Sequence, residues 1–270
     1  MNQLMRAIKS EWLKVFSTRV WWALALVMVI YIGFTAAMMG LMVSGILDGL
    51  SDEDLGIVDP QSIYTLGSSM GYIFPVLIGS LAITGEWRHR TITPTFLAAG
   101  RRGPVLAGKT IVQFGMGMLY GVLALTAAVL ASVALITHGG ASSGLGEGQT
   151  WVFFARSILV MGIWAAIGVG LGVLVRNQTA AVVIVIAFTQ FVEPLARLAA
   201  PFNEVTATVG RFLPGAATDA FVGDSLYTAM TAGAGGQTLE SWAALLVLVG
   251  YATVLLTVGW LARWRSADVT

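Results

Sequence analysis

The segment Gly103–Thr110 matches the pattern G-x-x-x-x-G-K-[ST] of a phosphate-binding loop. Such a loop cradles phosphates only when it follows a β-strand, precedes a helix and lies in a parallel sheet. Here Arg101 and Arg102 precede the segment, and a long apolar run follows it. We therefore expect the match to be coincidental and expect no ATP bound by this chain. At most, Lys109 and the start of the following helix would lie near lipid phosphates.

Few other side chains have the types and spacing that catalysis or metal binding needs. The chain has no cysteine, and its two histidines, His89 and His138, lie far apart in the sequence. Glu86 and His89 form one close pair, but the other acids show no metal-ligand spacing. We expect no catalytic residue, no metal site and no cofactor on this chain.

The segment 86–109 is too apolar for a simple polar connector. It carries five basic residues together with Ile92, Phe96 and Leu97. Pro94 suits the first turn of a helix and Gly100 suits its end, so we predict a short amphipathic helix over about 93–99. Two interpretations stay open: a surface helix that only sets topology, or a docking helix for a cytoplasmic protein.

The composition requires lipid around the chain. Hydrophobic residues make up 57% and charged residues 11% of the 270 residues, whereas a soluble domain carries roughly 25% charge. Apolar runs long enough to span a bilayer predict an all-α polytopic membrane protein, one domain over 1–270, with transmembrane helices at 20–43, 63–85, 110–137, 151–175, 178–192 and 241–262. The fifth run is short, because Glu193 and Pro194 follow it.

The placement of charges predicts the orientation. With the N-terminus inside, all but three of the 15 basic residues fall on the cytoplasmic side, and the three outside are Arg156, Arg197 and Arg211. Of the 14 acids, only Glu11, Glu86 and Asp268 fall inside. Only an even number of spans gives this pattern, so we expect a cell (inner) membrane protein with both termini in the cytoplasm.

Residues 1–19 form a separate predicted element. Apolar side chains recur at helical spacing and leave the basic ones, including Lys14, off that face. This predicts an amphipathic helix in the inner interface, with Trp12, Lys14 and Arg19 as its notable residues. It serves either as an anchor for the first span or as a lever that touches a cytoplasmic partner, and the two roles are compatible.

Segment 193–240 is expected outside, with short helices that dip into the outer leaflet. Gln190, Glu193 and Arg197 would cluster near the outer end of the fifth span, as an outer gate, a pathway contact or a structural ion pair. Arg156 is expected to snorkel to the interface. Glycines in the third and fourth spans predict close helix packing, at Gly115, Gly117, Gly121, Gly168, Gly170 and Gly172.

Four stretches carry a resemblance to a known family. They are the run 10–19 leading into Trp21 and Trp22, the segment 86–109, the turn Val175–Ala180, and Phe212–Gly215. In their order and spacing, the chain resembles a permease subunit of the ABC type-2 exporter family, and most of all its actinobacterial members. Arg90 stands where that family usually has Gly, and Gly100 where Pro is common.

The resemblance implies a complex. Two permease copies, identical or sister chains, would form a pathway above two ATPase subunits that hold ATP and Mg. The loop after the second span would insert into each ATPase, with the coupling region formed by Glu86, Arg88, Arg90, Thr91, Phe96 and Leu97. The transported compound would be hydrophobic or amphipathic, such as a drug, lipid or natural product, and the other partners would be membrane lipids, with no nucleic acid.

Two alternatives remain at this stage. The chain could be an ABC-type membrane subunit with a signalling or assembly role and no transport. Less favoured is a membrane-embedded enzyme that modifies lipids, because that function needs clustered His, Asp, Glu or Ser at a membrane face.

Overall fold

The computed structural model describes residues 3–44, 60–99, 101–138, 142–199, 204–223 and 238–265. Every regular element within these ranges is a helix. Six helical segments are long and apolar enough to cross a membrane, namely Val20–Met42, Ser62–Arg88, Arg102–His138, Gly148–Val175, Gln178–Ala199 and Ser241–Trp264. The chain is therefore an all-α polytopic membrane protein, as its hydropathy predicts.

Each span is built from one or more elements. The first, third and fourth are single helices, α2 (Val20–Val43), α7 (Arg102–His138) and α8 (Gly148–Val175). The second joins α3 (Pro60–Tyr64), α4 (Leu66–Ser69) and α5 (Ile73–Arg88). The fifth joins α9 (Gln178–Ala187), the π-helical segment η1 (Phe188–Val192) and α10 (Glu193–Ala199). The sixth joins α14 (Ser241–Gly259) and the π-helical segment η4 (Trp260–Trp264).

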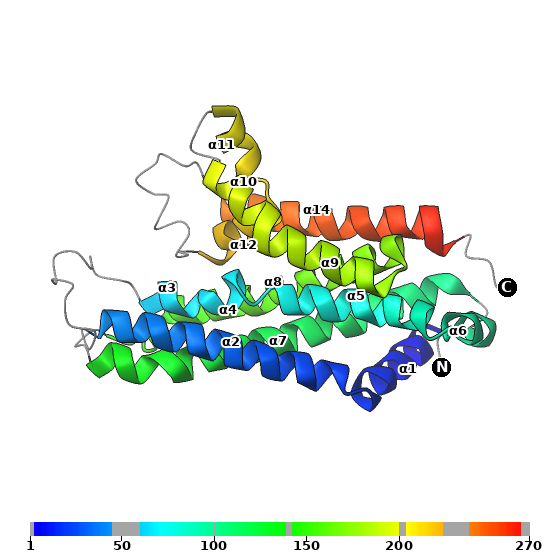
Figure 1. Ribbon diagram of the computed structural model, residues 1–270, viewed down its shortest axis with the longest axis horizontal. Coiled ribbons are helices and arrows are strands. Elements are labelled where there is room, and N and C mark those ends of the chain that lie inside the picture. The colour runs from blue at the N-terminus through cyan, green and yellow to red at the C-terminus, as the bar shows by residue number, and fades with distance from the viewer. Residues whose placement is uncertain are drawn as a thin grey trace.

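Within the described ranges, four helices lie outside the spans, namely α1 (Gln3–Ser17), α6 (Ile92–Ala99), α11 (Glu204–Gly210) and α12 (Pro214–Val222). In Figure 1, α1 and α6 lie at the same end of the bundle as the end of the sixth span, whereas α3, α10, α11 and α12 lie toward the opposite end. We name these the α6 end and the α12 end. The first span begins and the sixth span ends at the α6 end, which is what an even number of spans produces.

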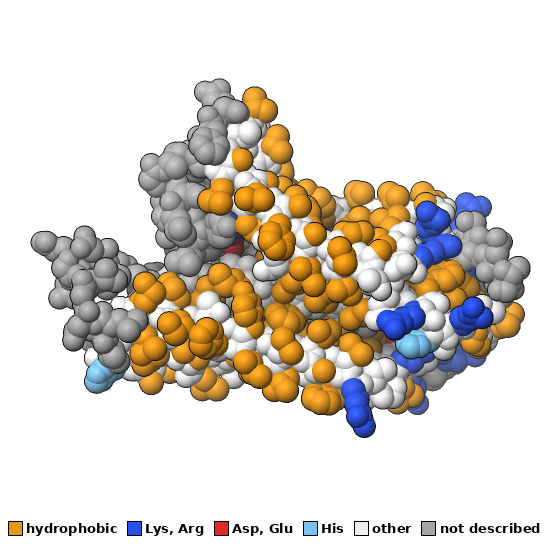
Figure 2. All heavy atoms as spheres, viewed as in Figure 1, with side chains coloured by type: hydrophobic (Ala, Val, Ile, Leu, Met, Phe, Trp, Pro, Cys, Tyr) orange, Lys and Arg blue, Asp and Glu red, His pale blue; other side chains and the backbone are white. Residues whose placement is uncertain are grey.

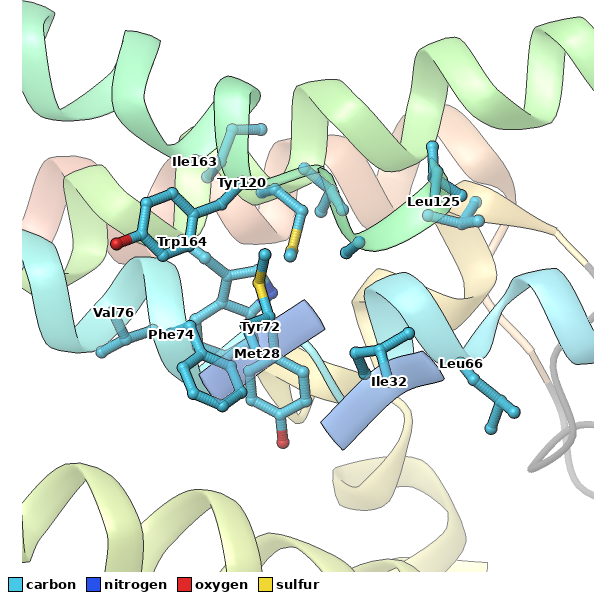
Figure 3. Packing of buried hydrophobic residues seen from close by; sticks show 14 of the residues in the cluster. Met28, Ile32, Leu66, Tyr72, Phe74, Val76, Tyr120, Leu125, Ile163 and Trp164 are labelled. Atoms are coloured by element: carbon cyan, nitrogen blue, oxygen red, sulfur yellow. The ribbon is translucent and has the colours of Figure 1, made fainter. Parts of the chain in front are cut away.

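The centre of the bundle is α8, which packs against α5, α7 and α14. Figure 3 shows the core between the spans, where side chains converge from α2 (Met28, Ile32), α7 (Tyr120, Leu125) and α8 (Ile163, Trp164). The α5–α8 contact is a backbone approach, because a Cβ at Gly168 would collide with the carbonyl oxygen of Val76. Since lipid tails are as apolar as these side chains, close packing rather than exclusion from water holds the spans together.

The outer spans leave large apolar side chains exposed. On α2 these include Leu26, Val27, Ile30 and Phe34. In Figure 2 apolar side chains cover the visible face along the spans, and Lys and Arg side chains gather toward the α6 end. A surface of this kind suits lipid.

Two span boundaries differ from the prediction. The third span begins at Arg102 rather than at 110, so the Gly103–Thr110 segment lies within the first turns of α7 and is a helix, not a loop. The fifth does not end at 192, because η1 leads directly into α10. Pro194 therefore lies inside a continuous helix, where it has no N–H to donate, and it directly follows the wider turn of η1.

Candidate functional site

Four charged side chains meet at the α6 end of the bundle. Lys109 Nζ of α7 lies 2.7 Å from Glu11 Oε2 of α1 and 2.8 Å from Glu86 Oε1 of α5. Lys14 Nζ of α1 lies 2.7 Å from Glu11 Oε1 and 2.7 Å from Glu86 Oε1. We call Glu11, Lys14, Glu86 and Lys109 the four-charge cluster. Its two acids and two bases balance, so the cluster joins three helices without leaving net charge in a buried place.

Burial makes this cluster unlike a surface ion pair. The side chain of Lys109 is 0% exposed and that of Glu11 is 4% exposed. The interpretation that Lys109 lies near lipid phosphates is therefore wrong, because its ammonium points inward to two carboxylates. A charged side chain such as Lys109 is tolerated within a span because its carboxylate partners neutralise it. Removing either partner would leave an unpaired buried charge.

Lys14 is the half-exposed member of the cluster. Burial alone would lower its pKa, but the nearby carboxylates of Glu86 and Glu11 outweigh that effect and raise the pKa of Lys14 above its usual range. Its ammonium also reaches Thr95 Oγ1 of α6 at 3.4 Å. Lys14 thus stays charged at neutral pH and connects α1 to both α5 and α6.

The rest of α1 is divided by exposure. Glu11 faces the bundle, whereas Trp12 and Arg19 are exposed. Trp12 packs on Phe16 with ring centroids 4.6 Å apart. The helix lies tightly on α7, since a Cβ at Gly108 would meet Ala7 Cβ at 2.9 Å. A polar inner face and an aromatic outer face fit a helix fixed to the bundle and bordered by lipid.

Helix α6 is fixed to the end of the sixth span through Phe96. The Phe96 ring packs edge-on against Trp264, with centroids 5.0 Å apart. The Arg102 guanidinium lies 4.9 Å from the Phe96 ring centroid, and the Trp264 indole N–H donates to the Arg102 carbonyl oxygen at 3.1 Å. Phe96 is 8% exposed. Although the resemblance placed Phe96 in the coupling region, its side chain anchors α6 to the protein and is not offered to a partner.

Four of the other predicted coupling residues are exposed around the start of α6, whereas Glu86 is buried in the four-charge cluster. Leu97 is 72% exposed, and Arg88, Arg90 and Thr91 are exposed as well. Arg88 donates to Gln178 Oε1 at 3.4 Å, at the start of the fifth span. An exposed apolar side chain and two exposed cations are thus presented at the α6 end.

Arg90 has φ 56°, a left-handed conformation that favours glycine. The departure from the family pattern at this position therefore retains the backbone shape that a glycine would give. Gly100, the other departure, lies outside the described residues.

The turn 175–180 connects the fourth and fifth spans at the same end. Arg176 closes α8 in the left-handed conformation, with φ 55°, and Asn177 Oδ1 caps α9 by accepting from the Ala180 N–H at 3.0 Å. The Arg176 guanidinium lies 4.5 Å from the Trp87 ring centroid and donates to the Arg263 carbonyl oxygen. This turn thus ties the fourth span to the ends of the second and sixth.

A second buried charge group lies toward the α12 end. Arg197 of α10 bridges Glu193 Oε1 at 3.2 Å and Asp219 Oδ2 of α12 at 2.7 Å. The side chains of both acids are almost fully buried. We call Glu193, Arg197 and Asp219 the three-charge cluster. It confirms the predicted contact of Glu193 with Arg197 and adds a third member from α12.

Neutral donors complete this cluster. The Tyr72 hydroxyl donates to Glu193 Oε2 at 3.1 Å, and the Ser69 hydroxyl donates to Asp219 Oδ1 at 2.7 Å. The Gly215 N–H, at the start of α12, donates to Glu193 Oε1. Tyr72 in turn stacks on Trp164, with ring centroids 4.4 Å apart. Two acids therefore share one arginine, and hydrogen bonds from the second span and α12 satisfy the remaining charge.

Gln190 does not join this cluster. It is exposed, and its side-chain amide donates to Thr189 Oγ1 at 3.5 Å. The wider π-helical turn of η1 separates it from Glu193 and turns it off that face. Arg156, expected to snorkel, lies 5.9 Å from the Phe221 ring centroid and donates to the Phe221 carbonyl oxygen at 3.5 Å.

The sequence did not predict three members of the two clusters as site residues, namely Glu11, Lys109 and Asp219, nor Tyr72, which donates to Glu193. A charge inside or beside an apolar run is the signal that could have found Glu11 and Lys109. Within the described ranges, no three His, Cys, Asp or Glu side chains are grouped so as to hold a metal ion. No protein-family model matches the chain, and no curated protein matches it significantly.

Proposed function

We propose that the chain is the membrane permease subunit of an ATP-driven ABC exporter that moves a hydrophobic or amphipathic compound out of the cell. In this proposal the α6 end faces the cytoplasm, together with both termini. A separate ATPase subunit, present in two copies, holds ATP and Mg and docks there. A second permease copy, identical or a sister chain, completes the pathway.

The observation that carries the proposal is how α6 is attached. Phe96 fixes it to Trp264 at the end of the sixth span, and Lys14 connects Thr95 to the four-charge cluster. Through that cluster α6 is linked to the end of the second span at Glu86 and to the third at Lys109. A push on α6 would therefore reach three spans and α1 together, as ATP-driven coupling requires.

The free side of the same helix supports a docking role. Leu97 is a large apolar side chain left exposed, and Arg88 and Arg90 are exposed at the same end of the protein. Exposed aliphatic side chains flanked by cations suit an apolar groove with acidic residues at its rim. A helix with one face fixed by packing and the other free can transmit force, whereas a flexible loop cannot.

Co-purification tests the proposal. We would express the chain with the ATPase encoded beside its gene and ask whether the two elute together. Leu97→Asp, alone and with Arg88→Ala and Arg90→Ala, should abolish co-elution, because a charge enters the apolar contact and the flanking cations are lost. ATP hydrolysis by the wild-type complex would be measured in parallel.

The matched control compares Leu97→Ala with Leu130→Ala. Alanine is used for this pair because an aspartate at position 130 would place a charge in lipid. Both leucines are 72% exposed, but Leu130 lies in the body of the third span. Only Leu97→Ala should weaken the complex. If no ATPase co-elutes with the wild-type chain, the exporter proposal fails. A stable complex whose ATP hydrolysis never responds to any transported compound would favour a signalling or assembly subunit.

A further inference from the structure

Helix α12 is joined to the spans by polar contacts at its start and in its middle. At its start, the Gly215 N–H donates to Glu193. One turn later, Thr218 Oγ1 accepts from the Trp164 indole N–H at 2.9 Å, and Asp219 pairs with Arg197 and Ser69. Ala217 of the same helix is 0% exposed. The polar contacts come from the second, fourth and fifth spans, and α12 also packs against α14 of the sixth span. Helix α12 thus covers the place where these spans meet.

Only a glycine fits at position 215, at the end of the segment Phe212–Gly215. A Cβ at this position would collide with the Glu193 carboxylate and the Arg197 guanidinium. Pro214 starts the helix with φ already suited to it. The start of α12, with its free N–H groups, is thereby placed directly on the Glu193 carboxylate, which a helix N-terminus stabilises.

A contact of this chemistry can be released. Buried ion pairs contribute little net stability, because desolvation offsets the attraction between the charges. Once water enters, each charge regains its hydration, which offsets part of the cost of separating the charges. The π-helical segment η1 directly precedes Glu193, and such segments inside helices are frequent at functional sites.

We propose that the three-charge cluster is a latch that holds α12 over the second, fourth and fifth spans, and that separation of Asp219 from Arg197 frees α12 to move and opens the α12 end of the protein. The latch itself stands on the contacts above. Its release by ATP hydrolysis rests on the proposed exporter function.

Cysteine accessibility tests the latch without any ATPase. The chain has no native cysteine, so Ala217→Cys supplies a single thiol on the covered face of α12. In intact cells, a membrane-impermeant maleimide should react slowly with this thiol while the latch is closed. Adding Arg197→Ala should raise the reaction rate at least about tenfold, because losing one partner of a buried charge pair shifts an equilibrium by more than a decade.

Four controls accompany that variant. Arg197→Lys keeps the charge but replaces the two bridging nitrogens with one ammonium, so it should give a rate between those of the parent and Arg197→Ala. Ser69→Ala removes one Asp219 contact and should also give an intermediate rate. Arg156→Ala removes an arginine that also contacts α12 at Phe221 and should change the rate less than about twofold, since the ion pairs remain. Val205→Cys, an exposed position on α11, should react equally in every background and controls for equal amounts of accessible protein.

The outcomes separate the two claims. If Ala217→Cys stays unreactive in Arg197→Ala, or if Arg156→Ala exposes it equally, the latch is wrong. With the co-purified ATPase reconstituted in nanodiscs, ATP should raise the reactivity of Ala217→Cys in the otherwise unchanged chain. A complex that hydrolyses ATP without this rise overturns the ATP-driven release, whereas failure to form any complex counts against the exporter function and leaves the latch supported by the cellular result.

Discussion

Lys109 of α7 and Glu11 of α1 form a buried ion pair, with Nζ and Oε2 2.7 Å apart. The two residues are 98 positions apart in the sequence. Their contact means that α1 is not held to the bundle by lipid alone, because its inner face supplies a counter-charge to a span. A movement of α1 would therefore be felt by α7, which suits the lever interpretation of this helix and does not remove its role as an anchor.

Replacing Lys109 should destabilise the protein strongly. Lys109→Met leaves Glu11 and Glu86 sharing only the half-exposed Lys14, so one buried carboxylate loses its counter-charge. Breaking a buried pair in this way costs about 3–5 kcal/mol. Thermal unfolding of the purified chain in nanodiscs would show the loss.

The control for this variant is Lys9→Met, which removes an exposed lysine from α1 and should change stability by less than about 0.5 kcal/mol. Glu11→Gln combined with Lys109→Met should recover part of the loss, because the unpaired charge is removed. Equal melting temperatures for Lys109→Met and Lys9→Met would show that the four-charge cluster does not stabilise the fold.

Phe96 and Leu97 are neighbours whose substitution by alanine should affect stability to very different extents. Phe96→Ala removes the packing of α6 on Trp264 and should cost about 3 kcal/mol, near the lower end for a buried Phe. Leu97→Ala should cost less than about 0.5 kcal/mol, because the side chain is exposed. Unfolding of both variants in the absence of any ATPase gives the comparison, and a larger loss for Leu97→Ala would mean that α6 is rotated from its described position.

Hydropathy predicted the number of spans and most of their extent, because apolar runs of spanning length have few other outcomes in a chain this poor in charge. It failed where a charge lies inside a span. The third span was predicted to start after Lys109 and the fifth to end before Glu193, yet both residues lie within their helices. The prediction placed these span boundaries at charged residues. In the folded protein, partners from distant segments neutralise Lys109 and Glu193, so the helices continue through them.

The partners themselves were beyond prediction from one sequence. Asp219 meets Ser69 across 150 residues, and Tyr72 meets Glu193 across 121. No local spacing encodes such contacts, whereas the i,i+4 contact of Glu193 with Arg197 was predictable. Gln190 was misplaced for a local reason, since a regular α-helix was assumed where the chain forms η1.

The glycines predicted to pack closely should divide into two groups on substitution. Gly168→Ala forces a methyl group into the Val76 carbonyl oxygen and should destabilise by about 1–3 kcal/mol, as overpacking does. Gly115→Ala meets nothing within 4 Å and should be neutral or stabilising by up to about 1 kcal/mol, because alanine favours the helix. Unfolding in the same nanodiscs measures both, and similar losses at the two sites would contradict the described α5–α8 approach.

Lys14 gives a prediction for the dependence of stability on pH. Its pKa is raised in the folded protein, where nearby carboxylates outweigh the effect of burial. The stability that it contributes is therefore fully present below the unfolded value of about 10.4 and is lost as pH rises through the folded pKa. The difference in melting temperature between the unchanged chain and Lys14→Met should stay constant from neutral pH to about pH 10 and narrow above it. The difference in melting temperature between the unchanged chain and Lys9→Met corrects for other titrating groups. If the difference for Lys14→Met already narrows near neutral pH, Glu11 and Glu86 do not hold Lys14 in its charged form.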